Sequence, residues 1–179
     1  VLGTFMAATL PERIEKIIMI DVTPFLKVYT NDIITASRKY YQAAKLNRSI
    51  HTLYKSREAA ARKRIAINPI FTMKLASALA LTEGGMIEVS GGFKWTFDLK
   101  LLFPNFMTLS SDAIASAMQN IIAKVCIIVA TNGLVKRFPD YQQQLASIKQ
   151  LELHELPGSH HIHLDEPEIV ATVVKHFLD

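Results

Sequence analysis

The chain has 179 residues, of which 50% are hydrophobic and 20% are charged, and its formal net charge is +4. This length permits one sizeable core, so we expect one domain or part of one. No apolar run approaches the roughly 18 residues of a membrane-spanning helix, so we exclude a bilayer-spanning protein and expect a soluble one. The positive charge comes largely from residues 38–74, but this segment lacks the interleaved aromatic residues of a nucleic-acid binder, so we expect a solvated helix face and no nucleic-acid partner.

The first part of the chain predicts a helix followed by a buried strand. Residues 1–10 carry apolar side chains at helical spacing and end before Pro11. Residues 16–21 (KIIMID) form a short apolar run that is typical of a strand buried on both faces of a parallel sheet. The opening segment does not begin with Met and lacks the features of a secretory signal, so we expect the true start of the protein to lie upstream.

The middle of the chain predicts a helical insert. Helical patterns cover about residues 31–66 and then residues 71–83 (FTMKLASALALTE), which are followed by two glycines. Residues 86–109 combine aromatics, a Gly pair and a Pro without clear periodicity, which indicates a loop or a short hairpin packed on these helices. A further helix is expected over about residues 112–120, capped by a serine.

The last third predicts two more strands and two helices. Residues 124–130 (KVCIIVA) read as a second buried strand, and residues 150–156 (QLELHEL) alternate in polarity, as expected for a strand nearer a sheet edge. A polar helix over about residues 139–148 separates these strands. Residues 167–178 begin with Pro and place apolar side chains along one stripe, which predicts a final helix.

The order of these elements predicts the fold class and the domain organisation. Strands that alternate with helices indicate an α/β protein with a mostly parallel sheet flanked by helices. We expect the core to comprise residues 1–24 and 121–179, and a helical cap or lid to comprise residues 25–120. Ligands bind such sheets at the carboxyl ends of the strands, which here fall at residues 21–24, 131–133 and 157–163.

The chain has a single cysteine, Cys126, within the predicted second strand. One thiol excludes an internal disulfide and a cysteine-rich zinc site. It fits a reducing environment, so we expect a cytoplasmic or other intracellular protein.

A histidine cluster lies in the segment LPGSHHIHLDEP, residues 156–167. The run His161-x-His163-x-Asp165 resembles the HxHxD ligands of binuclear metallohydrolases, but that motif normally closes with another His where this chain has Glu166. We therefore expect no metal and no other cofactor. One of these histidines can instead act as a general base, because it follows a strand and titrates near neutrality; the alternative is that they only bond to the loop backbone.

Four segments resemble known proteins. AATLPERIEKIIMIDVTP resembles the helix and strand that follow the nucleophile elbow of the α/β-hydrolase fold, and PGSHHIHLDEPEIVATVVKHFL resembles its histidine loop and last helix. GGFKWTFDLKLLFP and VCIIVATNGL look closest to the serine hydrolase-like proteins. The resemblance covers essentially the whole chain and implies a helical cap after the KIIMID strand.

This resemblance implies the site residues. The catalytic base of the family falls on His160. The usual position of the acid, after the KVCIIVA strand, holds Asn132, which can hydrogen-bond an imidazole but cannot stabilise imidazolium by charge. Some members place the acid after the preceding strand, and here that residue is Asp21, although an Asp there is also a common turn residue. Asp140 is a weaker third candidate, because it begins a predicted helix and can simply cap it.

The resemblance also implies an activity. The nucleophile of the family is the Ser of a Gly-x-Ser-x-Gly elbow, which this sequence lacks and which we expect just upstream of Val1. The complete protein would then be a serine hydrolase. It would cleave an ester or similar acyl bond of a small, apolar substrate through an acyl-serine intermediate. This chain alone would be nearly inactive. The alternative is a non-catalytic α/β-hydrolase-like protein that binds an apolar small molecule or a partner, and Asn132 favours it.

Overall fold

The structure is a computed structural model of the chain and describes residues 2–24, 33–45, 52–67, 72–103, 109–139 and 141–179. The chain divides into two compact units. The first comprises Val1–Leu26, Ile70–Met73 and Leu109–Asp179, and the second comprises Lys27–Pro69 and Lys74–Thr108. No helix in the described ranges combines the length and the apolar character that crossing a membrane requires.

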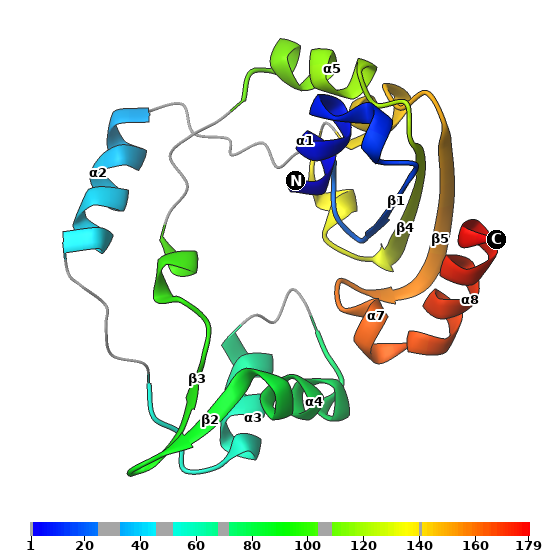
Figure 1. Cartoon of the computed structure of the whole chain (residues 1–179). Helices are drawn as coiled ribbons and strands as arrows, with labels where there is room; N and C mark the ends of the chain where they lie inside the picture. The colour runs from blue at the N-terminus through cyan, green and yellow to red at the C-terminus, as the bar shows by residue number, and fades with distance from the viewer. Residues whose placement is uncertain (1, 25–32, 46–51, 68–71, 104–108, 140) are drawn as a thin grey trace. The chain divides into compact units, whose positions relative to one another are not determined.

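The first unit is built on a parallel sheet of three described strands, β1 (Lys16–Ile20), β4 (Lys124–Asn132) and β5 (Leu151–Ser159), in the order β1-β4-β5 (Figure 1). The middle strand β4 is buried from Val125 to Ala130. Neither face of a strand that is covered on both sides contacts solvent, which explains the unbroken apolar run of KVCIIVA. The predicted parallel sheet is confirmed, and β5 lies at one edge of the described sheet, as its alternation predicts.

Helices cover both faces of this sheet. The strand pleat sends alternate β4 side chains to opposite sides. On one side, Val125, Ile127 and Val129 join the core formed with α1 (Leu2–Thr9), α5 (Ser111–Gln119) and α6 (Tyr141–Ala146). On the other side, Cys126, Ile128 and Ala130 pack with the short α7 (Ile162–Asp165) and with α8 (Pro167–Leu178).

Some boundaries differ from the sequence prediction. We expected the cap to extend over residues 25–120, whereas the structure groups α5 with the sheet unit, because Ile114 and Met118 are buried in its core. The capping serine of α5 is Ser110, whose Oγ accepts the backbone N–H of Ala113 at 3.1 Å. The helix α6 is shorter than predicted, and the four-residue α7 was not predicted.

The second unit contains α2 (Ile33–Lys45), α3 (Arg57–Ile67), α4 (Leu75–Gly85) and a hairpin of β2 (Met86–Val89) and β3 (Gly92–Trp95). Of the two structures expected within residues 86–109, a loop or a short hairpin, the hairpin is present at residues 86–95. The Arg57 guanidinium donates to the carbonyl oxygens of Thr82 at 2.5 Å and Met86 at 3.0 Å, and it lies over the Phe93 ring. This one side chain thereby connects α3 with α4 and with both strands of the hairpin.

Candidate functional site

The carboxyl ends of the three described strands of the first unit carry the predicted site residues. Asp21 directly follows β1, Asn132 is the last residue of β4, and His160 directly follows β5. Because parallel strands end at the same edge of a sheet, residues far apart in the sequence can meet there.

Asp21 and His160 are in direct contact across 139 positions of sequence. Nδ1 of His160 lies 2.8 Å from Oδ2 of Asp21. The Asp21 side chain has no exposed surface, whereas the His160 side chain remains 26% exposed. A buried carboxylate therefore orients an imidazole ring that still reaches the surface.

The backbone of two other segments holds the Asp21 carboxylate in place. The N–H of Ala130 donates to Oδ1 at 3.1 Å, and the N–H of Leu134 donates to Oδ2 at 2.6 Å. Asp21 itself has a φ of 47°, in the left-handed region that non-glycine residues rarely occupy. Such a conformation costs about 1–3 kcal/mol and persists where the surroundings fix it, often at functional sites. Asp21 is therefore more than an ordinary turn residue.

Gly133 leaves the space that this carboxylate occupies. A Cβ built on Gly133 would lie 2.0 Å from Oδ1 of Asp21 and 2.5 Å from Oδ2. Any larger residue at this position would have to displace the carboxylate. The glycine directly after β4 is thus part of the candidate site.

The hydrogen bonds to the Asp21 carboxyl group favour its ionised form. Burial alone would raise the pKa of this carboxyl, but the hydrogen bonds from His160, Leu134 and Ala130 outweigh burial and lower the pKa below its ordinary value. An ionised carboxylate only accepts hydrogen bonds, so Nδ1 of His160 carries the proton in this contact. In the neutral ring, Nε2 is then the basic nitrogen, which is the arrangement that general-base catalysis requires.

The loop that carries His160 is fixed on both sides. Gly158 has a φ of 150°, and its N–H donates to Oγ1 of Thr131 at 3.2 Å. The hydroxyl of Ser159 donates to the carbonyl oxygen of Thr72 at 2.6 Å. After His160, the side chain of Ile162 is completely buried and begins α7. This explains why the chain turns sharply at Pro-Gly and returns at once to the core.

The two other histidines of the cluster lie beside His160. The ring centroids of His160 and His161 are 4.9 Å apart, and those of His161 and His163 are 6.2 Å apart. Desolvation and the charge of His160 lower the pKa of His163, and Asp165 opposes this shift. Among the described residues, His161, His163 and Asp165 do not gather their ligand atoms into a potential metal site.

Asn132 has a different position from Asp21. It is exposed at the end of β4 and pairs with Ser159 in the strand register. The carboxylate that contacts Nδ1 of His160 belongs to Asp21. The third candidate acid, Asp140, lies outside the described residues.

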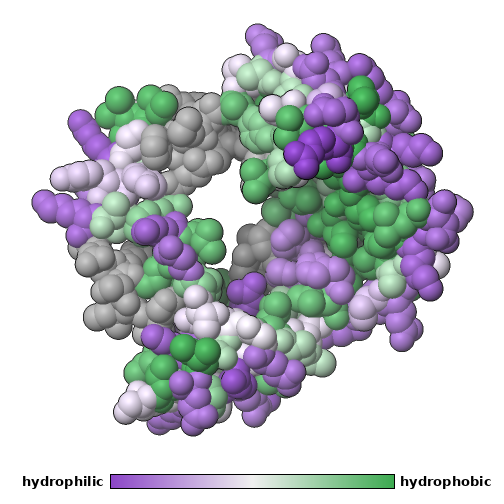
Figure 2. Space-filling model, in the orientation of Figure 1, coloured by the Kyte–Doolittle hydropathy of each residue, from purple (hydrophilic) through white to green (hydrophobic). Residues whose placement is uncertain are grey.

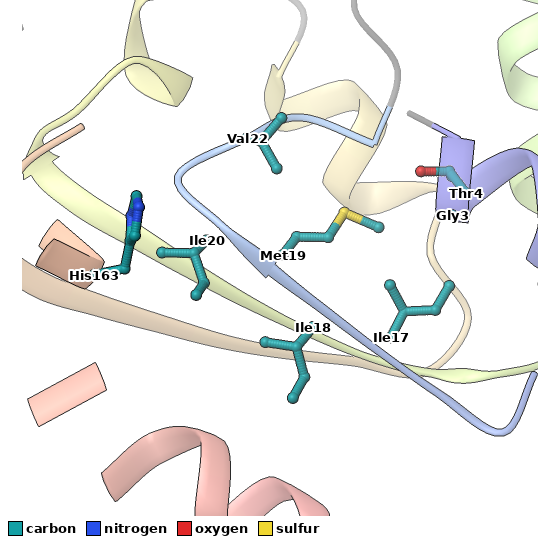
Figure 3. Close-up of a pocket in the computed structure, with 8 residues that line it drawn as sticks. All are labelled: Gly3, Thr4, Ile17, Ile18, Met19, Ile20, Val22 and His163. Atoms are coloured by element: carbon teal, nitrogen blue, oxygen red, sulfur yellow. The ribbon is translucent and has the colours of Figure 1, made fainter. Parts of the chain in front are cut away.

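A pocket opens along β1, which is an edge strand of the described sheet. Its lining includes Ile17, Ile18, Met19 and Ile20, four successive residues whose side chains alternate between the two faces of the sheet (Figure 3). Side chains from both faces of the sheet can line one pocket only at an edge of the sheet that no further strand covers. Figure 2 shows apolar surface gathered around this part of the sheet unit. His163 also lines the pocket, next to Ile20 in Figure 3.

Sequence reasoning missed the supporting groups of the site. The roles of the Ala130 and Leu134 N–H groups have no sequence signal, because every non-proline residue has such a donor. Gly133 had a signal, the Asn-Gly pair directly after a buried strand, but this pair is typical of any turn and does not reveal a contact with Asp21.

Comparison with known proteins supports the architecture. No protein-family model matches the chain. A serine hydrolase-like protein of Danio rerio is 31% identical to it, over 99% of this chain and 57% of that protein. The chain therefore spans less than two thirds of this relative.

Two solved structures share the fold. A hypothetical protein of Pseudomonas aeruginosa matches with a TM-score of 0.82 and 25% identity, over 98% of this chain and 61% of that protein. The peroxisomal alpha-beta-hydrolase Lpx1 of Saccharomyces cerevisiae matches with a TM-score of 0.62 and 15% identity, over 98% of this chain and 49% of that protein. This second likeness shows the fold alone.

The parallel sheet, its helices on both faces and these matches together show that the chain has the α/β-hydrolase fold. The chain is similar over nearly its whole length to a serine hydrolase-like protein.

Proposed function

We propose that His160 and Asp21 are the base and the acid of a serine hydrolase active site. The complete protein would cleave an ester or similar acyl bond of a small molecule. One observation carries this proposal: Nδ1 of His160 lies 2.8 Å from Oδ2 of the buried, ionised Asp21. The name of the zebrafish relative, serine hydrolase-like protein, supports the same reaction class.

In this mechanism, Nε2 of His160 removes the proton of a serine hydroxyl while the serine oxygen attacks the acyl carbon. The ring is then a cation, and the Asp21 carboxylate stabilises its charge. His160 next gives the proton to the leaving alcohol, which leaves an acyl-serine. In the second half, the ring activates a water molecule, and hydrolysis of the acyl-serine returns the enzyme to its first state.

The serine is proposed to lie on a segment that pairs with β1. The 179 residues contain no Gly-x-Ser-x-Gly elbow. In the described sheet β1 is an edge strand, and its apolar side chains line an open pocket along that edge. An open edge with apolar neighbours is a surface that an additional parallel strand can cover. A strand there would end beside Asp21, close to the ring of His160.

The proposed substrate is an ester with an apolar acyl part. Val22 follows Asp21 and Leu134 follows Gly133, and both are partly exposed next to the site. Apolar side chains around a few polar groups are typical of a small-molecule pocket. Because Cys126 is a free, buried thiol, we further propose a reducing, cytoplasmic or other intracellular compartment.

A fluorophosphonate probe tests the proposal, because it labels only an activated serine. We expect the complete protein to be labelled and to hydrolyse short p-nitrophenyl esters, and His160→Ala to abolish both reactions. His176→Ala, a change on the exposed side of α8, is the matched control and should leave labelling intact.

The 179-residue chain by itself should neither be labelled nor hydrolyse these esters. Ester hydrolysis by this chain that His160→Ala abolishes would contradict the proposed position of the serine. If the complete protein is never labelled and His160→Ala changes no reaction, a non-catalytic binding protein becomes the better interpretation.

A further inference from the structure

Three side chains with metal-binding atoms meet on the face of the sheet that α8 covers. They are Cys126 on β4 and Glu152 and His154 on β5, named here the Cys126 cluster. One ligand atom from each residue lies within 4.8 Å of the other two. None of these residues takes part in the site at the strand ends.

The strand register explains why these residues meet. Cys126 is the partner of Glu152, and Ile128 is the partner of His154, in the parallel pairing of β4 and β5. Residues two apart on a strand point to the same face, so His154 and Glu152 lie side by side on the face that Cys126 occupies. Ile128 and Ala130 of β4 lie on the same face, in a core cluster with Phe177 of α8. Two ionisable side chains therefore lie beside a thiol, next to this apolar cluster.

From this arrangement we infer that the Cys126 cluster binds a divalent transition metal, Zn²⁺ in the first place, and so connects the middle strand with the edge strand. The chemistry of the three donors supports this choice. Thiolate, imidazole and carboxylate are the ligands that Zn²⁺ takes in proteins, whereas Ca²⁺ and Mg²⁺ prefer oxygen alone.

The geometry needs only a small adjustment to hold the ion. In a tetrahedral zinc site, neighbouring ligand atoms are about 3.3–3.6 Å apart, which follows from the usual bond lengths. Nε2 of His154 and Oε1 of Glu152 are 2.5 Å apart, at hydrogen-bond distance. A metal ion between them would replace this hydrogen bond and move the two atoms apart by about 1 Å. The sulfur atom, within 4.8 Å, would move slightly closer.

The cluster is also accessible from one side. Cys126 is completely buried, whereas the His154 and Glu152 side chains are 29% and 42% exposed. An ion can enter from the edge strand, and water can supply the fourth ligand. Burial and the charge of Glu152 raise the pKa of the Cys126 thiol, so the thiol is not a ready nucleophile and loses its proton when the metal binds.

The Cys126 cluster is independent of the proposed hydrolase site. Cys126 lies four residues before Ala130, whose N–H contacts Asp21, and this separation along β4 is about 13 Å. The metal would therefore stabilise the sheet without touching the ester chemistry, and its binding does not depend on the proposed function.

Cobalt titration of the reduced, metal-free full chain tests the inference, because Co²⁺ replaces Zn²⁺ and is coloured. We expect one Co²⁺ per chain and a thiolate-to-cobalt charge-transfer band in the near ultraviolet that excess Zn²⁺ removes. Cys126→Ser should abolish the band. His154→Gln and Glu152→Gln should each weaken binding at least about tenfold, the scale of losing a metal-site partner.

His163→Gln is the matched control, because it removes a histidine of the strand-end cluster and should leave the band and the affinity unchanged. Zn²⁺ at a hundred times the wild-type Kd should raise the Tm of the wild type by about 5–10 °C and that of His154→Gln by about half as much or less. If Cys126→Ser does not fold, the two β5 variants decide the test. Three results would overturn the inference. The wild-type chain could show no charge-transfer band, or the band could survive Cys126→Ser. Alternatively, binding could be lost in His163→Gln but kept in His154→Gln.

Discussion

The carboxylate of Asp21 occupies the space that a side chain on Gly133 would need. A Cβ on Gly133 would lie 2.0 Å from Oδ1 and 2.4 Å from Cγ of Asp21. The glycine after β4 and the acid after β1 therefore depend on each other, although 112 positions separate them in the sequence (133 − 21).

Gly133→Ala should destabilise the first unit and misplace the acid. The added methyl group cannot fit without moving a buried carboxylate that three donors hold, and overpacking of this kind costs about 1–3 kcal/mol. Urea unfolding followed by circular dichroism measures the loss. Gly84→Ala is the control, because nothing lies within 4 Å of its added Cβ in α4, and alanine favours a helix. Equal stability of Gly133→Ala and wild type would show that the carboxylate does not need this space.

Asp21→Asn should lower kcat of the complete protein by about 10⁴-fold, the size typical of an acid that fixes the histidine tautomer. The amide NH₂ of Asn can donate to Nδ1 of His160, which then leaves the proton on Nε2 and removes the base. Steady-state kinetics with an ester substrate measures the effect. Asn132→Ala should keep kcat close to the wild-type value, and a larger loss in Asn132→Ala than in Asp21→Asn would identify Asn132 as the functional partner.

The stability of the first unit should fall at acid pH because of Asp21. Its pKa is lower in the folded chain than in the unfolded chain, so the unfolded chain binds the proton first as the pH falls. The stabilisation is fully present above the ordinary pKa of about 4 and is lost as the pH falls through the folded pKa. Urea unfolding between pH 3 and pH 6, roughly the range around that ordinary value, should show the wild type approaching Asp21→Asn at the acid end. A constant difference between the two proteins over this range would contradict the prediction.

Arg57→Ala should unfold the second unit more easily. The change leaves the carbonyl oxygens of Thr82 and Met86 without the guanidinium, and losing a charged donor at a part-buried position costs about 1–3 kcal/mol. Trp95, the single tryptophan, lies in this unit, so its fluorescence reports the unfolding. Arg62→Ala on the same helix removes only an exposed pair with Glu58 and should cost less than about 0.5 kcal/mol. Similar effects of both changes would show that the Arg57 contacts do not stabilise the unit.

The positions of the strands were predictable because a buried strand is a short apolar run in the sequence. KIIMID and KVCIIVA became β1 and β4, and the alternation of QLELHEL placed β5 at an edge of the described sheet. The border of the insert was less predictable, since α5 has the amphipathic pattern of any surface helix. Only the packing of Ile114 and Met118 shows which unit it belongs to.

The sequence by itself determined the fold class and the strands, because each of these depends on short runs of neighbouring residues. It indicated His160 as the proposed base through the resemblance of its loop to the histidine loop of α/β-hydrolases. It left Asp21, Asn132 and the weaker candidate Asp140 open as partners of that histidine, since composition cannot decide which of them contacts it. The tertiary structure decided which carboxylate contacts Nδ1, through the N–H groups of Ala130 and Leu134 and the space left by Gly133. The same holds for the Cys126 cluster, since strand register alone brings its three residues together.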